Sequence, residues 1–87
     1  MATQSYIIQS EEKLIDGSAT GEDCAQIRHA YEHECACMGN DRPFPENYDV
    51  WGTLWLNALS LNRKVTSNGA CRVELARLIE AMNPVYA

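Results

Sequence analysis

The fold is decided by residues 50–61, which read VWGTLWLNALSL and carry more unbroken apolar surface than any other segment. At 100° per residue, the apolar side chains of this region other than Leu56 fall on one arc of about half the circumference of a helix. Pro45 suits a first helical turn because its missing N–H costs nothing there, and Arg63 and Lys64 suit the negative end of the helix dipole. The sequence predicts a central helix over residues 45–64.

A second helix is predicted over residues 21–38. Thr20 and Asp23 have the spacing of a capping box at its start, and Gly39 with Asn40 supplies a stop signal at its end. Side chains at helical spacing then form a core face made of Cys24, Ile27, Tyr31, Cys35 and Met38.

A last helix is predicted over residues 69–83, because residues 66–69 break the chain and offer a cap, and because Asn83-Pro84 is a stop signal. Its apolar stripe consists of Cys71, Leu75, Leu78, Ile79 and Met82. Residues 4–16 fit a short additional helix, or alternatively an extended arm followed by a shorter helix capped by Ser10. We expect one all-α domain over residues 1–87: a small bundle of three principal helices with a short N-terminal fourth.

The central helix is more apolar than one packing partner requires. It either lies in the middle of the bundle with neighbours on two sides, or it also forms an interface through its aromatic side chains. We expect a homodimer, either through this helix with Trp55 and Leu56 at the interface or through the first helix. Gly52 would let another element approach closely, or is tolerated at a cost of about 1 kcal/mol.

The net charge of −5 is unevenly distributed along the chain. Residues 1–50 contain ten acidic and three basic side chains, whereas residues 51–87 contain two acidic and four basic ones. This balance disfavours direct nucleic-acid binding, which needs a basic surface. The acidic half is either a solvated face or a surface complementary to a basic partner, such as a nucleic-acid-binding protein.

A metal site is suggested by only one group of residues. His29 and His33 are four residues apart, and Cys37 continues their stripe by one turn, so the three could share a zinc ion. Cys35 and Cys37 point about 200° apart on a helix and cannot reach one ion together, and no Cys-x-x-Cys knuckle is present. We therefore favour no metal and no cofactor, with a metal- or redox-responsive module at His29, His33 and Cys37 as the alternative.

The four cysteines are expected to be free thiols. Cys24 and Cys35 would lie about 16 Å apart along a helix, too far for a disulfide. Cys24, Cys35 and Cys71 suit the core, whereas Cys37 is expected to be reactive or to lie at an interface. A nucleophilic pair of Cys37 with a histidine would lack a third orienting group, so we expect no enzymatic activity and no catalytic residues.

The expected function is binding to a larger protein. The N-terminus lacks a basic region followed by an apolar run, and no stretch reaches the ~18 apolar residues of a membrane span, so a cytoplasmic protein is expected. Small acidic chains without motifs are common among phage and mobile-element products that block host machinery such as CRISPR systems. The alternatives to this function are the metal- or redox-responsive module and a small-ligand binder in which Trp51 and Trp55 line a pocket between subunits. The candidate partner-binding residues are Glu22, Asp23, Glu32, Glu34, Trp55 and Leu56.

Overall fold

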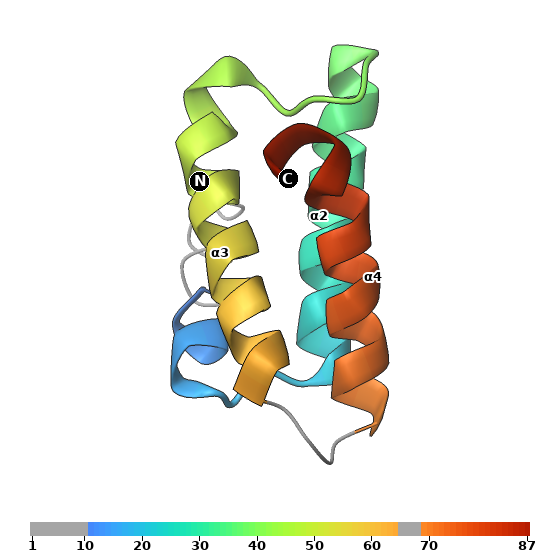
Figure 1. The fold of residues 1–87 in the computed structure, drawn as a ribbon. Helices are drawn as coiled ribbons and strands as arrows, with labels where there is room; N and C mark the ends of the chain where they lie inside the picture. The colour runs from blue at the N-terminus through green and yellow to red at the C-terminus, as the bar shows by residue number, and fades with distance from the viewer. Residues whose placement is uncertain (1–10, 65–68) are drawn as a thin grey trace.

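The computed structural model describes residues 11–64 and 69–87, and every regular element within them is helical. The elements in chain order are α2 (Gly21–Met38), the 3₁₀ helix η1 (Pro45–Asn47), α3 (Tyr48–Lys64) and α4 (Gly69–Tyr86) (Figure 1). Residues 11–16 are also helical, whereas the rest of the predicted helix over residues 4–16 lies outside the described residues. The predicted all-α bundle is confirmed.

The bundle has a parallel pair of helices. Figure 1 shows that α2 and α4 run in the same direction and that α3 runs opposite to both. Helix α4 packs against both α2 and α3. As a result, α2 and α4 end where the loop of residues 39–47 and the start of α3 lie (Figure 1). We call this the loop end of the bundle.

The core follows the stripes that the sequence indicates, except that Met38 of α2 and Ile79 of α4 are only partly buried. On α3, Trp51 is only 1% exposed, and its ring meets Tyr31 of α2 edge to face, with ring centroids 5.3 Å apart. Such an aromatic pair adds roughly 0.5–1.5 kcal/mol to the free energy of burial. The buried side chains of the three main helices are Cys24, Ile27, Tyr31, Cys35, Trp51, Leu54, Ala58, Leu61, Cys71, Leu75, Leu78 and Met82. Within the described ranges, no helix is long and apolar enough to cross a lipid bilayer.

The start of α3 differs in detail from the prediction. The predicted helix begins at Pro45, but its first turn is the 3₁₀ helix η1, and α-helical geometry begins only at Tyr48. A 3₁₀ turn is a frequent way for an α-helix to start, and the backbone N–H of Asn47 donates to the carbonyl of Phe44 at 2.9 Å within it.

The end of α4 contradicts the prediction that the helix stops at Asn83-Pro84. The helix continues to Tyr86 with Pro84 inside it. Tertiary contacts hold the final turn: the Tyr86 hydroxyl donates to the Tyr48 carbonyl at 2.7 Å, and the Tyr48 hydroxyl donates to the Val85 carbonyl at 3.3 Å. These contacts offset the hydrogen bond that proline cannot make.

The predicted capping box of α2 is present. The Asp23 N–H donates to the Thr20 hydroxyl at 3.1 Å, the Thr20 N–H donates to the Asp23 carboxylate at 2.9 Å, and Lys13 lies 3.4 Å from that carboxylate. The pKa of Asp23 is lowered, first by the backbone hydrogen bond from Thr20 and further by the Thr20 side chain and Lys13.

This cap predicts a pH-dependent stability difference between the wild type and Asp23→Asn. Because folding lowers the pKa of Asp23, its stabilising contribution is present above the unfolded pKa of about 4 and is lost as the pH falls through the lower folded pKa. We expect the variant to melt a few degrees below the wild type at pH 7, and the difference to shrink at pH 2–3, measured by circular dichroism. A difference that stays constant with pH would contradict this assignment.

Candidate protein-binding site

The net charge of the protein is concentrated at the loop end. The half of the bundle that includes the loop end, here called the loop half, is made of residues 30–55 and 78–87. It contains six carboxylates and one basic side chain, Arg42. The other half contains six acidic and six basic side chains, and residues 1–10 and 65–68 contain neither kind. The whole charge of −5 therefore belongs to the loop half. Its carboxylates are Glu32, Glu34, Asp41, Glu46, Asp49 and Glu80.

Helix dipoles add to the negative potential there. The C-terminal ends of α2 and α4 carry partial negative charge, and neither has a basic residue in its last turn. The positive N-terminal end of α3 lies at the same end of the bundle, but Glu46 of η1 and Asp49 of α3 already complement it. The loop end thus presents two uncompensated negative helix ends as well as its carboxylates.

The four predicted acidic residues do not form one cluster. Glu22 and Asp23 lie in the first turn of α2, at the far end from the loop. Glu32 is ten residues beyond Glu22, a rise of about 15 Å along the helix. Asp23 is held in the capping box, and Glu22 accepts a hydrogen bond from Gln26 at 3.4 Å. Of this pair, Glu22 is the more exposed.

Glu34 is an internal residue, which corrects the expectation that its side chain is exposed. Its carboxylate is partly buried and accepts three hydrogen bonds: from the Phe44 backbone N–H at 2.8 Å, from the Asn47 side chain at 2.9 Å and from the Trp51 indole at 3.2 Å. These donors come from the loop, η1 and α3. Glu34 therefore ties α2 to the loop and to α3, and both of its oxygens are used within the protein.

Glu32 is exposed and belongs to a chain of ion pairs between α2 and α4. Arg28 lies 3.3 Å from Glu32 and 3.6 Å from Glu74, and Arg77 lies 2.8 Å from Glu74. Exposed pairs of this kind contribute roughly 0–1 kcal/mol to stability. Glu32 is thus positioned by Arg28 yet accessible to a partner.

Four acidic residues of the loop half were not among the predicted binding residues. Asp41, Glu46, Asp49 and Glu80 are exposed, and none of them forms an ion pair within the described part of the chain. They are scattered over 40 positions of sequence, and only the parallel arrangement of α2 and α4 brings Glu80 to the same end as the others. Charge counted along the chain contains no signal for that arrangement.

The predicted apolar interface residues differ in exposure. Leu56 is 60% exposed on the outer side of α3. Trp55 is half-buried against α4, where its ring stacks on Tyr86 with centroids 6.0 Å apart, and its indole N–H is buried with no hydrogen-bond acceptor in the described residues. Gly52 provides the predicted close approach: a Cβ there would lie 3.1 Å from the Tyr86 ring. The element that approaches is the last turn of α4.

The histidine and cysteine stripe is exposed on α2. The Cys37 thiol lies 3.6 Å from Nε2 of His33, and that contact is the one hydrogen-bond-like interaction that the His33 side chain makes in residues 11–64 and 69–87. Within the same residues, no three His, Cys, Asp or Glu side chains gather as metal ligands. His33 and Cys37 therefore meet, but His29 does not complete a three-ligand group with them.

The four thiols differ sharply in environment. Burial, with Cys71 close by, raises the pKa of the Cys24 thiol to about 12, and burial also raises the pKa of Cys35. Cys71 is buried and its thiol donates to the Ala19 carbonyl at 3.3 Å. Cys37 alone of the four is exposed. The predicted placement of Cys24, Cys35 and Cys71 in the core is confirmed, whereas the expectation that Cys37 is reactive or lies at an interface stays a prediction.

This contrast predicts the result of thiol labelling. Because the thiolate is the reacting species, the native reduced protein should take up one equivalent of iodoacetamide rapidly at pH 8, at Cys37, and the other three only on unfolding. Mass spectrometry of the intact protein counts the labels taken up, and mass spectrometry of its peptides identifies which cysteine carries each label. Cys37→Ser should remove the fast phase, and fast labelling of Cys24 or Cys71 would contradict the structure.

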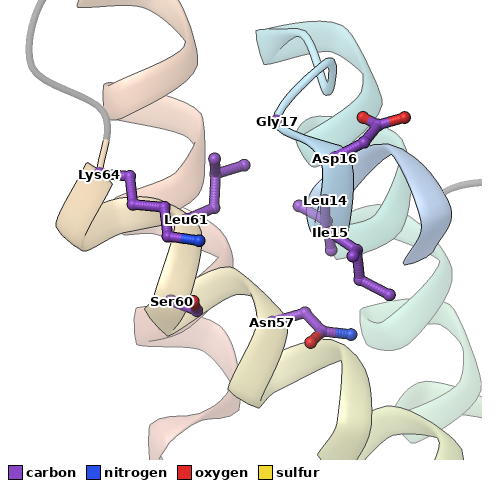
Figure 2. Close-up of a pocket in the computed structure, with 8 residues that line it drawn as sticks. All are labelled: Leu14, Ile15, Asp16, Gly17, Asn57, Ser60, Leu61 and Lys64. Atoms are coloured by element: carbon purple, nitrogen blue, oxygen red, sulfur yellow. The ribbon is translucent and has the colours of Figure 1, made fainter.

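A hollow of about 370 Å³ lies between residues 14–17 and α3. Figure 2 shows the Lys64 side chain on the α3 side of this hollow, beside Leu61, while the Asp16 carboxylate points away from α3. Neither Trp51 nor Trp55 lines it, and Trp51 is fully buried within the bundle. A tryptophan-lined pocket between subunits stays a prediction. The acidic loop end remains the candidate site. In comparisons with known proteins, no family model, curated protein or solved structure matches this chain.

Proposed function

We propose that this protein is non-enzymatic and acts by binding a larger protein that has a basic surface, using its acidic loop end. The observation that carries the proposal is that the whole net charge of −5 lies in one half of the bundle. A field from charges grouped at one end steers a basic partner and orients it before contact.

The exposed carboxylates of the loop end are available for such a partner. Asp41, Glu46, Asp49 and Glu80 make no ion pair among the described residues, so a partner's basic side chains would not have to displace internal ones. Glu34, in contrast, would have to give up three internal hydrogen bonds. We therefore assign binding to the exposed group and to Glu32, and not to Glu34.

Binding to a basic surface would block nucleic acid from that surface. Proteins that bind nucleic acid place lysine and arginine where phosphates lie, and a compact group of carboxylates competes for that surface. We infer that the partner is a nucleic-acid-binding protein and that this chain occludes its basic surface. An inhibitor from a phage or mobile element directed at a defence system such as CRISPR is one instance of this class.

The test compares two double variants with the same change of charge. Asp41→Asn with Glu46→Gln removes two exposed carboxylates from the loop end, and Glu12→Gln with Glu22→Gln removes two from the opposite half. Affinity capture from the source cell identifies the protein retained by the wild type. The purified partner should bind the wild type and the Glu12/Glu22 variant with equal affinity, and the Asp41/Glu46 variant at least tenfold more weakly. It should also release its bound nucleic acid when the wild type is added. Equal binding by both variants would contradict the proposal.

Self-association through α3 is a second proposal, supported by the exposed Leu56 side chain. Leu56→Glu should convert a dimer to a monomer in native mass spectrometry without loss of helical circular dichroism, because the residue is 60% exposed. The matched control is Val73→Glu on α4, which introduces the same charge at another exposed apolar position. A monomeric wild type would rule this proposal out.

A further inference from the structure

A hollow of about 450 Å³ lies between the C-terminal ends of α2 and α4. It exists because small side chains, Ala36 on α2 and Ala81 on α4, stand where larger ones would fill the seam between the helices. The buried Tyr31 and Cys35 and the ring of Pro84 complete its apolar surface.

Polar groups surround this apolar surface. Glu32, Asn40 and Asp41 also line the hollow. A second hollow of about 250 Å³ adjoins it along the seam, shares Glu32 and Ala81 with it, and includes Glu80. Exposed carboxylates therefore stand on the α2, loop and α4 sides of one groove.

The charges in and near the groove favour a cation. The hollow is at the loop end, where the last turns of α2 and α4 contain no basic residue. Arg28 and Arg77 line the adjoining hollow: Arg77 is paired with Glu74, and Arg28 is paired with both Glu74 and Glu32. An incoming cation would therefore share Glu32 with Arg28. Arg42 is exposed on the loop and is not among the lining residues. No basic side chain of the described chain lines the larger hollow itself.

One buried polar atom at the hollow has no partner. The Tyr31 hydroxyl is shielded from solvent and makes no hydrogen bond within the described residues, with only the weakly bonding Cys35 thiol beside it. An unpaired buried hydroxyl costs roughly 1–3 kcal/mol. A donor that enters the hollow would reach this hydroxyl only when the Tyr31 side chain shifts towards the hollow, because the hydroxyl has no solvent-exposed surface.

We propose that this hollow binds an arginine side chain of the partner protein. The inference rests on the proposed function and names the group that the acidic loop end recognises. The methylene stem of arginine packs on Ala36, Ala81 and Pro84, and the guanidinium lies between Glu32 and Asp41. Arginine fits better than lysine because its five planar donors match acceptors that are spread around a rim.

The first test is a titration of the ¹⁵N-labelled full chain with the peptide acetyl-Ala-Arg-Ala-amide, followed by NMR. Saturable shifts should appear at the amides of Ala36, Asn40, Asp41 and Ala81. The same peptide with citrulline, which keeps the shape and lacks the charge, should give none, and the lysine peptide should bind more weakly. Shifts spread over both halves of the bundle, or equal binding of the citrulline peptide, would overturn the proposal.

The second test fills the hollow without changing charge. Ala36→Leu, at an exposed position that lines it, should weaken binding of the arginine peptide by roughly tenfold or more. Ala76→Leu, at an exposed position of α4 that does not line it, should bind as the wild type does. Melting curves of both variants establish that they are folded. Unchanged peptide binding by a folded Ala36→Leu would overturn the inference.

The two proposals can fail separately. If the captured partner binds Ala36→Leu as tightly as the wild type but binds the Asp41/Glu46 variant weakly, the acidic loop end is the binding surface and the proposal of an arginine-binding hollow is wrong. If no partner is captured by any form, the proposed function fails, and with it the assignment of the hollow to a partner's arginine, whatever the peptide shows.

Discussion

Glu34→Ala is expected to lower the melting temperature by roughly 10–20 °C, although it removes a residue whose sequence position suggests a surface acid. The substitution leaves the Phe44 N–H and the Trp51 indole N–H without their acceptor in a partly buried place. A hydrogen bond to a charged group contributes about 1.5–3 kcal/mol, and stranded donors add their desolvation penalty. For a domain of this size, 1 kcal/mol corresponds to about 4–8 °C.

Two variants make this prediction specific. Glu32→Ala removes an exposed carboxylate from the same helix and should change the melting temperature by only a few degrees. Glu34→Gln should be intermediate, because its amide oxygen can still accept and the Asn47 amide can turn to pair with its NH₂ group. Thermal circular dichroism at pH 7 measures all three. If Glu32→Ala and Glu34→Ala have the same melting temperature, Glu34 does not connect α2 to the loop and α3.

Tyr86→Ala should have the second largest effect, a loss of about 2–3 kcal/mol in the free energy of unfolding. The Tyr86 ring packs on Gly52, stacks on Trp55, and contacts the Tyr48 ring with centroids 4.8 Å apart. Removing an aromatic ring from full burial costs about 3–5 kcal/mol, and less is expected here because Tyr86 is half-buried. Trp55 also loses its cover, so tryptophan emission should shift to longer wavelength.

The control for this second prediction is Tyr86→Phe. It retains the ring and removes only the 2.7 Å hydrogen bond to the Tyr48 carbonyl, which should cost about 1 kcal/mol and leave the emission unchanged. Urea unfolding followed by fluorescence gives both readouts. Equal losses in the two variants would mean that the hydroxyl, and not ring packing, holds the last turn of α4.

Helix positions were largely predictable because they depend on local signals. The capping box at Thr20 and Asp23 and the left-handed Gly39 bound α2 at the predicted residues. Pro84 misled the prediction because Tyr86, the last residue of α4, donates a hydrogen bond to the Tyr48 carbonyl at the start of α3 and so holds the final turn. The helix therefore continues past the local stop signal at Pro84, because Tyr86 bonds to Tyr48, a residue 38 positions away in sequence.

The candidate site was predictable only in part. The acidic character was evident from composition, and Glu32 is exposed as expected. Glu34 has the same chemistry two residues away, but on a helix its side chain points about 200° from that of Glu32, towards the loop and α3. The acids Asp41 and Glu80, far apart in sequence, became candidates only when the path of the chain was known.

By itself, the sequence determined that this protein is helical, where α2 begins and ends, which stripes are apolar and how much charge it carries, because periodicity, caps and composition act within a few residues. Only the tertiary structure decided that α2 and α4 run parallel. That arrangement places two uncompensated negative helix ends and six of twelve carboxylates at one end, and leaves a small-residue hollow between those helices. The physical reason is that the grouping of charges and the position of the hollow depend on which helix ends lie together. Packing between segments that are distant in sequence decides which ends those are.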